Sequence, residues 1–432
     1  MSWISKLQQL SRDPVRIVQF FMLCRQTGVL LSSVIVARYL PLEQVGVFEM
    51  LMMCGFLMTF FWSDAFLKGY LASDFPKDTP GVASTFLWFY LVVSLMAMSV
   101  LVIGQHFLLP LFVHRPSLEG LRLFAIYQAI IVPVWIAPFI GLLKSRHSLL
   151  LSIYVLVGPT FSCLVGLMSI PDLSGVLIGL VSYALVGLIW VLLNSTYVRE
   201  LRLKQMFTDL WPATWPLIMY AVSIAIARSF DGWLVALHFD DSSFAIFRYG
   251  AREFPLVIAL AAGLSTIMIP KLKALEALDE LKSRTTRLMH LCYPIVAGFL
   301  MTSPILFETF FGSAYRESAL IFNIYLLLTL TQLVFPQTVL MARGDTKLLW
   351  YISVAELLVN VLASLVLLSF FGLIGIVWGT LVAYIFEKIV LLIIAKNRYG
   401  IRPRQMVNTR VWVGYAGLLS IVFILAKWMF GI

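Results

Sequence analysis

Long apolar runs separated by short polar segments follow one another along the chain. A helix needs about 20 consecutive apolar residues to cross a bilayer, and thirteen stretches of this sequence meet that length. They are residues 17–38, 45–70, 82–104, 119–143, 147–169, 174–197, 212–238, 243–269, 287–311, 317–342, 347–371, 373–395 and 409–430. Since only helices satisfy their own backbone hydrogen bonds in lipid at this length, the pattern predicts an all-α, polytopic membrane protein.

The composition agrees with this prediction, because 61% of the residues are apolar and only 12% are charged, against about 45–50% and 25% in soluble domains. The apolar run after the polar, basic start is too long for a signal peptide and predicts an uncleaved first span. All cysteines lie inside apolar runs without paired spacing: Cys24, Cys54, Cys163 and Cys292. They are predicted to be packing residues, so neither disulfides, nor a metal site, nor a cofactor is expected.

The basic residues explain the net charge of +10. With a cytoplasmic N-terminus and alternating spans, twenty-one Lys and Arg residues fall in inside segments and five in outside segments. This distribution follows the positive-inside rule. The net charge therefore reflects the orientation of the spans in the membrane rather than a nucleic-acid partner. With an odd number of spans, this orientation predicts that Ile432 lies on the outer side.

Two halves of the chain are similar at an offset of about 200 residues. Residues 37–50 align with 236–249, and Gly175 and Gly179 align with Gly375 and Gly379. An offset of six spans predicts two six-helix lobes in the same orientation, a transporter architecture with the cargo site between the halves. The predicted N-lobe is 1–197, the cytoplasmic linker 198–211 and the C-lobe 212–396, followed by a cytoplasmic loop and a thirteenth span within 397–432.

A second cytoplasmic segment, residues 271–287, has leucines at helical spacing with charges on the opposite face. This pattern predicts either a surface helix on the inner leaflet or a solvated linker helix.

Five ionised side chains lie close together between two apolar runs: Arg228, Asp231, Arg248, Arg252 and Glu253. Each costs about 2.5–3.5 kcal/mol near the middle of a membrane helix, so such groups usually face a partner or a wet cavity. Arg248 and Arg252 are four residues apart, which predicts one helical face that binds an anionic cargo; the alternative is that they extend to the outer interface. Arg228 and Asp231 are three apart, so they share a face and can neutralise each other.

Arg25, in the first span, is a further cargo candidate. Its guanidinium matches the geometry of phosphate oxygens. A structural ion pair with Glu49 or Glu356 is the alternative.

Acidic residues inside spans are candidates for ion coupling, because burial favours uptake of a proton or cation by a carboxylate. The candidates are Asp231, Glu49 and Glu356. A structural, hydrogen-bonded role is the alternative for each. Glu387 adjoins Lys388 and is predicted to lie at the inner interface.

Several segments carry a family likeness: RYLPLEQVGVFEM after the first run, DGWLVALHFDDSSFAIFRYGAREFP around the eighth, and FFGLIGIVWGTLVAYIFEK at the twelfth. In these segments the chain resembles the polysaccharide (O-antigen type) flippases of the multidrug/oligosaccharidyl-lipid/polysaccharide exporter superfamily. The resemblance implies two six-helix lobes, alternating access, a polyprenyl-diphosphate-linked glycan as cargo, polysaccharide assembly machinery as partners, and a bacterial inner membrane. The thirteenth span departs from the twelve-helix pattern.

Three other functions stay open from the sequence. A lipid II flippase has the same cargo chemistry, whereas a cation-coupled multidrug exporter would favour an acidic first span. A membrane-embedded polymerase or ligase would carry catalytic residues in a large outer loop. The longest outer loop, 105–118, has only His106 and His114 as groups of that kind, so no catalytic residues are predicted.

Overall fold

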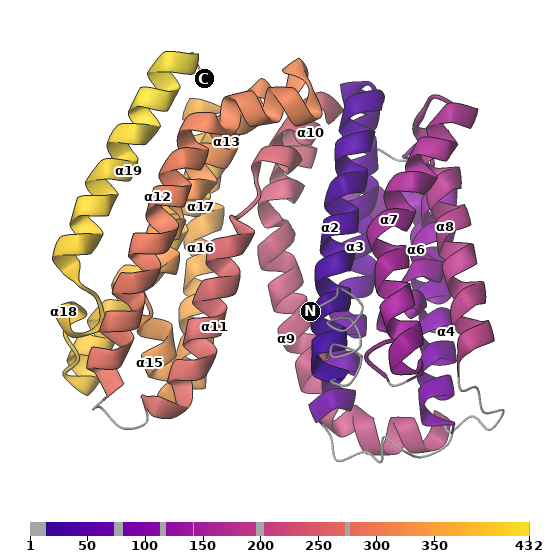
Figure 1. The fold of residues 1–432 in the computed structure, drawn as a ribbon, viewed down its shortest axis with the longest axis horizontal. Coiled ribbons are helices and arrows are strands. Elements are labelled where there is room, and N and C mark those ends of the chain that lie inside the picture. The colour runs from indigo at the N-terminus through magenta and orange to yellow at the C-terminus, as the bar shows by residue number, and fades with distance from the viewer. Residues whose placement is uncertain are drawn as a thin grey trace, which may run out of the picture. The chain divides into compact units, whose positions relative to one another are not determined.

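The computed structural model describes residues 14–72, 81–112, 118–140, 142–195, 203–272 and 277–431. His114 and residues 198–202 of the predicted linker lie outside these ranges. The described chain is built of helices, and Figure 1 shows their arrangement within two compact units, Met1–Ala245 and Ile246–Ile432. Each unit is described by itself.

The first unit consists mainly of long apolar helices. They are α2 (Pro14–Tyr39), α3 (Leu42–Ala72), α4 (Val82–Ile103), α5 (Gln105–Phe112), α6 (Leu121–Ile136), α7 (Ser145–Ser169), α8 (Leu173–Asn194) and α9 (Leu203–His238), followed by α10 (Asp241–Gly250), where the units divide. α2 packs along α7, α6 contacts α4 and α8, and α9 packs along α3. The predicted lobe boundaries stay predictions.

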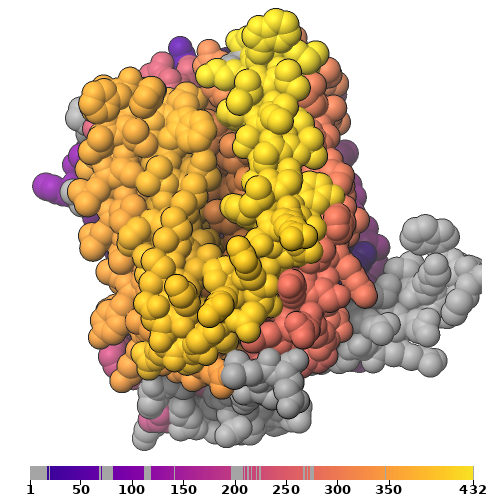
Figure 2. Space-filling view, turned by 90° about the vertical axis from the view of Figure 1, so that its left-hand side faces the viewer, coloured from indigo at the N-terminus to yellow at the C-terminus, as the bar shows by residue number. Residues whose placement is uncertain are grey.

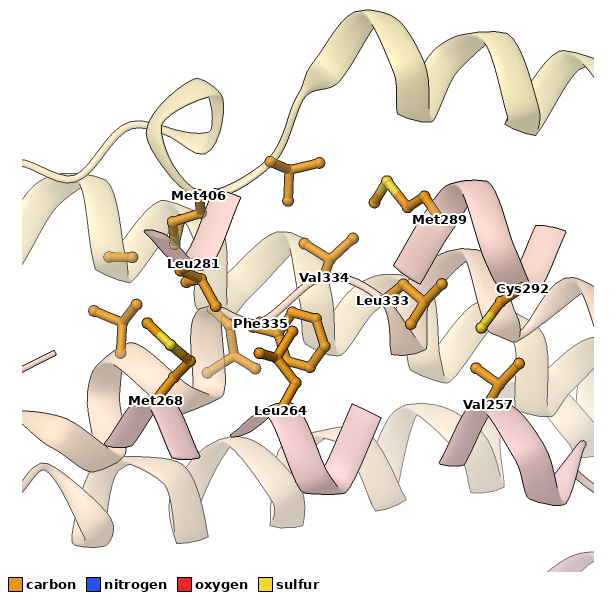
Figure 3. Close-up of a cluster of buried hydrophobic side chains, with 14 of the residues drawn as sticks. Val257, Leu264, Met268, Leu281, Met289, Cys292, Leu333, Val334, Phe335 and Met406 are labelled. Carbon is orange, nitrogen blue, oxygen red and sulfur yellow. The ribbon is translucent and has the colours of Figure 1, made fainter. Parts of the chain in front are cut away.

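The second unit surrounds one hydrophobic core. Its helices are α11 (Pro255–Lys271), α12 (Leu278–Phe311), α13 (Arg316–Leu327), α14 (Thr329–Gln332), α15 (Pro336–Ala342), α16 (Thr346–Phe371), α17 (Leu373–Tyr399), α18 (Pro403–Met406) and α19 (Thr409–Phe430), with a 3-10 turn at Ser313–Tyr315. Figure 3 shows Leu264 and Met268 of α11 near Phe335, which lies in the bend between α14 and α15. The buried side chains fix these short helices against α12 and α18.

The prediction of a multi-pass, all-helical membrane protein is confirmed. Within the described residues, nine helices are long and apolar enough to cross a membrane, or ten if the bent segment α13 to α15 counts as one span. The cysteines were predicted to be packing residues, and Cys24, Cys54, Cys163 and Cys292 are indeed all buried and free.

The thirteen runs are nevertheless not thirteen uninterrupted helices. The eighth run breaks between Gly250 and Pro255, and the tenth bends by 45° before Pro336. Each proline occupies the start of the next helix, because a proline disfavours helical conformation in the residue before it. The fourth run forms only the 16-residue helix α6.

The prediction of a separate surface or linker helix at 271–287 was wrong from Leu278 onward. That part of the chain is the first part of α12, which continues without interruption to Phe311. Leu278 and Leu281 are buried in the core of the second unit, while Glu280 forms ion pairs with Lys271 and Arg284 at 2.7 Å each on the exposed face. The amphipathic pattern was real, but its apolar face packs on protein rather than on lipid.

Glycines bring one helix pair in each unit into close contact. A Cβ atom at Gly179 of α8 would collide with the carbonyl oxygen of Ser162 in α7. A Cβ atom at Gly379 of α17 would lie 2.6 Å from the backbone nitrogen of Ser364 in α16. Aligned glycines of the two halves therefore make the same kind of crossing, as small residues do between membrane helices.

Replacing Gly179 or Gly379 by Ala should therefore destabilise the protein. Overpacking of this kind costs about 1–3 kcal/mol, which corresponds to a drop in Tm of about 2–12 °C for a unit of this size. Thermal unfolding of the purified protein measures the effect. Gly263→Ala is the control, because nothing lies within 4 Å of its Cβ position; an equal drop in the control would contradict the crossing argument.

Candidate functional site

Two clusters of polar and ionised side chains lie inside the apolar helices, one in each unit. We call the first the Arg25 site: Arg25 with Tyr127, Trp135 and Tyr183. The second is the carboxylate cluster: Glu253, Glu356, Glu387 and Lys388.

The Arg25 site forms where α2 packs along α7, and side chains of α6 and α8 lie beside Arg25. The Arg25 guanidinium carbon lies 5.1 Å from the centroid of the Trp135 ring, in a cation–π geometry. The hydroxyl groups of Tyr127 and Tyr183 interact with it electrostatically. Gly28, one turn further along α2, permits this position because its missing side chain lets α2 approach the backbone of Val155 in α7.

Tyr183 is held in place by Tyr154. The two rings stack at 5.0 Å, and the Tyr154 hydroxyl donates a hydrogen bond of 2.6 Å to the Tyr183 carbonyl oxygen. The aromatic wall around Arg25 is therefore fixed by contacts between α7 and α8.

Arg25 has no carboxylate partner among the residues that the structure describes. The alternative of a structural ion pair with Glu49 is therefore not formed. A cation–π contact stabilises by about 0.5–2 kcal/mol, less than the cost of about 2.5–3.5 kcal/mol for a charge inside a membrane helix. The site keeps an uncompensated positive charge, which attracts an anion with oxygen acceptors.

The carboxylate cluster lies between α11, α14, α16 and α17. The Glu253 carboxylate accepts hydrogen bonds from the Gln332 amide at 2.7 Å and from the Tyr384 hydroxyl at 3.2 Å. Its position follows from the break before Pro255, because a continuous helix would present this side chain in another direction. Glu253 is therefore bound by neutral donors.

Glu356 of α16 is half-buried, and its carboxylate interacts electrostatically with Glu387, Lys388 and Glu253. Lys388 pairs with Glu387 at 2.9 Å and donates to the Gln337 amide oxygen at 3.1 Å. Three carboxylates thus share one lysine, which leaves a formal excess of two negative charges when all are ionised. Such a cluster favours the uptake of a proton or cation.

The interfacial position predicted for Glu387 stays a prediction, and the structure adds that its side chain is mostly buried. The side chains of Lys388 and Glu387 are only 11% and 16% exposed, and α17 continues to Tyr399, beyond the predicted end of the span at residue 395. Eleven residues at 1.5 Å each separate Lys388 from that end, or about 16 Å.

The structure also shows a polar stripe that the sequence analysis missed. Asn360 and Ser364 follow Glu356 at intervals of four along α16; the Ser364 hydroxyl donates to Asn360 at 3.0 Å and lies 3.3 Å from the Ile376 carbonyl oxygen of α17. The spacing was visible in the sequence as three polar positions on one face of an apolar helix. Tyr384, Gln332 and Gln337 carried no comparable signal, because hydroxyl and amide side chains are common in membrane helices.

The predicted face formed by Arg248 and Arg252 is absent. α10 ends at Gly250, so Arg252 lies in the break; its guanidinium donates to the Arg248 carbonyl oxygen at 3.4 Å and stacks over the Tyr249 ring at 4.9 Å. Arg252 therefore caps the end of α10 instead of continuing the face of Arg248.

The remaining candidates lie in the first unit. Asp231 and Glu49 are buried, 9% and 6% exposed, in α9 and α3, whereas Arg228 is exposed. Arg228 and Asp231 thus lie on the same helix, but only Asp231 is buried. No group of three or more His, Cys, Asp or Glu side chains in the described residues is placed to hold a metal ion.

Solved structures of other proteins share this architecture, although sequence comparisons find no match. No protein-family model matches the sequence, and no curated protein matches it either. Among solved structures, the lipid II flippase MurJ in an inward closed conformation matches 96% of this chain and 98% of its own, with a TM-score of 0.59 and 16% identity. An inward-facing multidrug resistance MATE family transporter of the MOP superfamily matches 87% of this chain and 94% of its own, with a TM-score of 0.60 and 12% identity.

The chain has the fold of the MOP-superfamily transporters. A MOP superfamily transporter from Pyrococcus furiosus matches 91% of this chain and 97% of its own, with a TM-score of 0.51 and 14% identity. At these identities the likeness establishes the fold of nearly the whole chain, while the cargo has to be argued from this chain's own residues.

Proposed function

We propose that this protein is a flippase that moves a polyprenyl-diphosphate-linked oligosaccharide, of the O-antigen type, from the inner to the outer leaflet of a bacterial cytoplasmic membrane by alternating access. The observation that carries the proposal is the uncompensated charge of Arg25 inside an aromatic site. A diphosphate presents the oxygen acceptors that a guanidinium binds, and aromatic rings suit sugars or prenyl groups. Arg228, Arg248 and Arg252 add positive charge as secondary cargo candidates.

The same observation disfavours a multidrug exporter with cationic cargo, because Arg25 would repel it. A lipid II flippase is the second candidate, since the match to MurJ covers nearly the whole chain and lipid-linked cargoes share a diphosphate. The proposal includes the N-terminus in the cytoplasm and polysaccharide assembly machinery as partners.

We further propose that the carboxylate cluster couples transport to a proton, with Glu356 as the central group and Glu49 and Asp231 as candidates in the first unit. Glu356 has no full counter-charge, because Lys388 is already paired with Glu387. A carboxylate without a full counter-charge favours the uptake of a proton or a cation, and the dependence on a pH gradient tests the proton.

The test is translocation by purified protein in vesicles that carry a polyprenyl-diphosphate-linked oligosaccharide. We expect movement between leaflets that depends on a pH gradient and is outcompeted by polyprenyl diphosphate. Glu356→Gln, which is neutral and of the same shape, should remove the pH dependence, whereas Glu308→Gln, an exposed residue of α12, should not.

Each alternative gives a distinct result in these vesicles. Faster transport of lipid II than of the oligosaccharide lipid would favour the second candidate, and transport of organic cations alone would reject both lipid cargoes. Formation of new glycosidic bonds without translocation would identify a polymerase or ligase instead. Unchanged pH dependence in Glu356→Gln would contradict the coupling role of the carboxylate cluster but not the proposed cargo.

A further inference from the structure

A groove beside the thirteenth predicted span is not explained by the proposed function. Helices α17 and α19 run next to each other but leave a cavity of about 700 Å³ between them. Figure 2 shows the hollow between the yellow helix α19 and the orange helices beside it. The walls are almost entirely apolar, with side chains such as Leu381, Ile385 and Ile389 of α17 on one side and Phe423 and Ile424 of α19 on the other.

The groove is a fixed feature, because α19 is held along its length by polar contacts to other helices. The Trp412 ring nitrogen donates to the Leu330 carbonyl oxygen at 2.9 Å. The Tyr415 hydroxyl lies 2.9 Å from the His290 ring of α12, and Arg316 donates to the Phe430 carbonyl oxygen at 2.5 Å. α19 therefore cannot close onto α17 without losing these bonds.

The two ends of the groove differ. At one end, the rings of Trp378 and Phe423 meet edge to face at 6.2 Å. At the other end lie Pro403, Val407 and Thr409, which belong to the segment joining α17 to α19. From Trp378 to Leu392 the α17 wall spans fourteen residue steps, or about 21 Å at 1.5 Å per step, against about 30 Å for the hydrocarbon core of a bilayer.

Exposed basic side chains lie at the end formed by the segment that joins α17 to α19. Arg402, Arg404 and Arg410 flank the lining residues and are exposed. Two other cations are already neutralised: Arg398 pairs with Asp345 at 3.0 Å, and Lys388, which lines the groove itself, pairs with Glu387. The groove thus combines a long apolar slot with positive charge at one end, the chemical complement of an anionic head group with a hydrocarbon chain.

We propose that this groove is a binding site for an anionic phospholipid of the surrounding bilayer, with an acyl chain along α17 and α19 and the phosphate at Arg402, Arg404 and Arg410. An empty apolar slot beside lipid would forfeit the dispersion contacts that a chain supplies. Each basic residue near an anionic membrane surface adds about 1 kcal/mol of attraction. The site is independent of the proposed cargo site and gives the thirteenth span a role.

The test compares two substitutions one helical turn apart. Ile389 and Ile393 are both 51% exposed on α17, but only Ile389 lines the groove. Native mass spectrometry of the full chain, extracted in mild detergent and then offered phosphatidylglycerol, should detect retained lipid. Ile389→Trp, which fills the slot, should lower the retained phosphatidylglycerol by about tenfold, and Ile393→Trp should not.

A second comparison addresses the head group. The triple variant of Arg402, Arg404 and Arg410 to Gln should lower the preference for phosphatidylglycerol over phosphatidylethanolamine by about tenfold. The same change at Lys282, Arg284 and Arg287 of α12 removes three charges elsewhere and should keep the preference. The proposal is overturned if wild-type protein retains no phospholipid, if both tryptophan variants retain equal amounts, if the retained lipid is an isoprenoid, or if the two triple variants behave alike.

Discussion

Replacing Arg25 by Gln should lower the translocation of a polyprenyl-diphosphate-linked oligosaccharide by between about tenfold and about a hundredfold. A hydrogen bond to a charged group contributes about 1.5–3 kcal/mol, and 1.4 kcal/mol corresponds to a factor of ten. Gln retains much of the side-chain length and some hydrogen bonding but loses the charge. Translocation by Arg25→Lys should lie between that of the wild type and that of Arg25→Gln, because a lysine keeps the charge but lacks the planar guanidinium group. Vesicle transport at equal protein levels measures the effect.

Thermal stability separates this role from a structural one. Because Arg25 has no carboxylate partner in the described residues, Arg25→Gln should leave Tm unchanged or raise it, as the membrane cost of the charge exceeds the cation–π contact. Arg122→Gln is the matched control, since Arg122 is an exposed residue of α6 in the same unit. Wild-type transport in Arg25→Gln, or an equal loss in Arg122→Gln, would remove Arg25 from the cargo site.

The second large effect concerns stability. Lys388→Met should destabilise the protein by about 3–5 kcal/mol, because it removes a buried lysine and leaves the mostly buried Glu387 carboxylate without its partner. This corresponds to a fall in Tm of about 6–20 °C. The double variant Lys388→Met/Glu387→Gln should recover most of the loss, since it removes both charges. Thermal unfolding in a single detergent compares the three proteins.

The matched control lies on the same helix. Arg398 pairs with Asp345 at 3.0 Å but is 57% exposed, so Arg398→Met should cost no more than about 1 kcal/mol. Equal losses at Lys388 and Arg398 would mean that Lys388 is solvated and that the carboxylate cluster is not a buried charge network.

The candidate site was only partly accessible from the sequence. Arg25 and Glu356 could be predicted as site residues, because an ionised residue in an apolar run costs free energy in a membrane and therefore points to function. Their surroundings could not be predicted, because Trp135 and Tyr183 come from helices more than 100 residues further along the chain. The spacing of Arg248 and Arg252 gave a wrong prediction, because the helix that would have placed both on one face breaks between Gly250 and Pro255. Glu253 was seen as a charge, but its bonds to Gln332 and Tyr384 depend on that same break.

By itself, the sequence determined that this chain is an all-helical membrane protein, where most of its long helices lie, and which glycines are equivalent in its two halves. These features follow from local apolarity and from short repeated spacings, which each segment carries alone. The tertiary structure decided which charges are paired and that α19 leaves a groove beside α17. Those outcomes depend on contacts between distant segments, because whether a buried charge is neutralised is set by its neighbours in space and not by its neighbours in the chain.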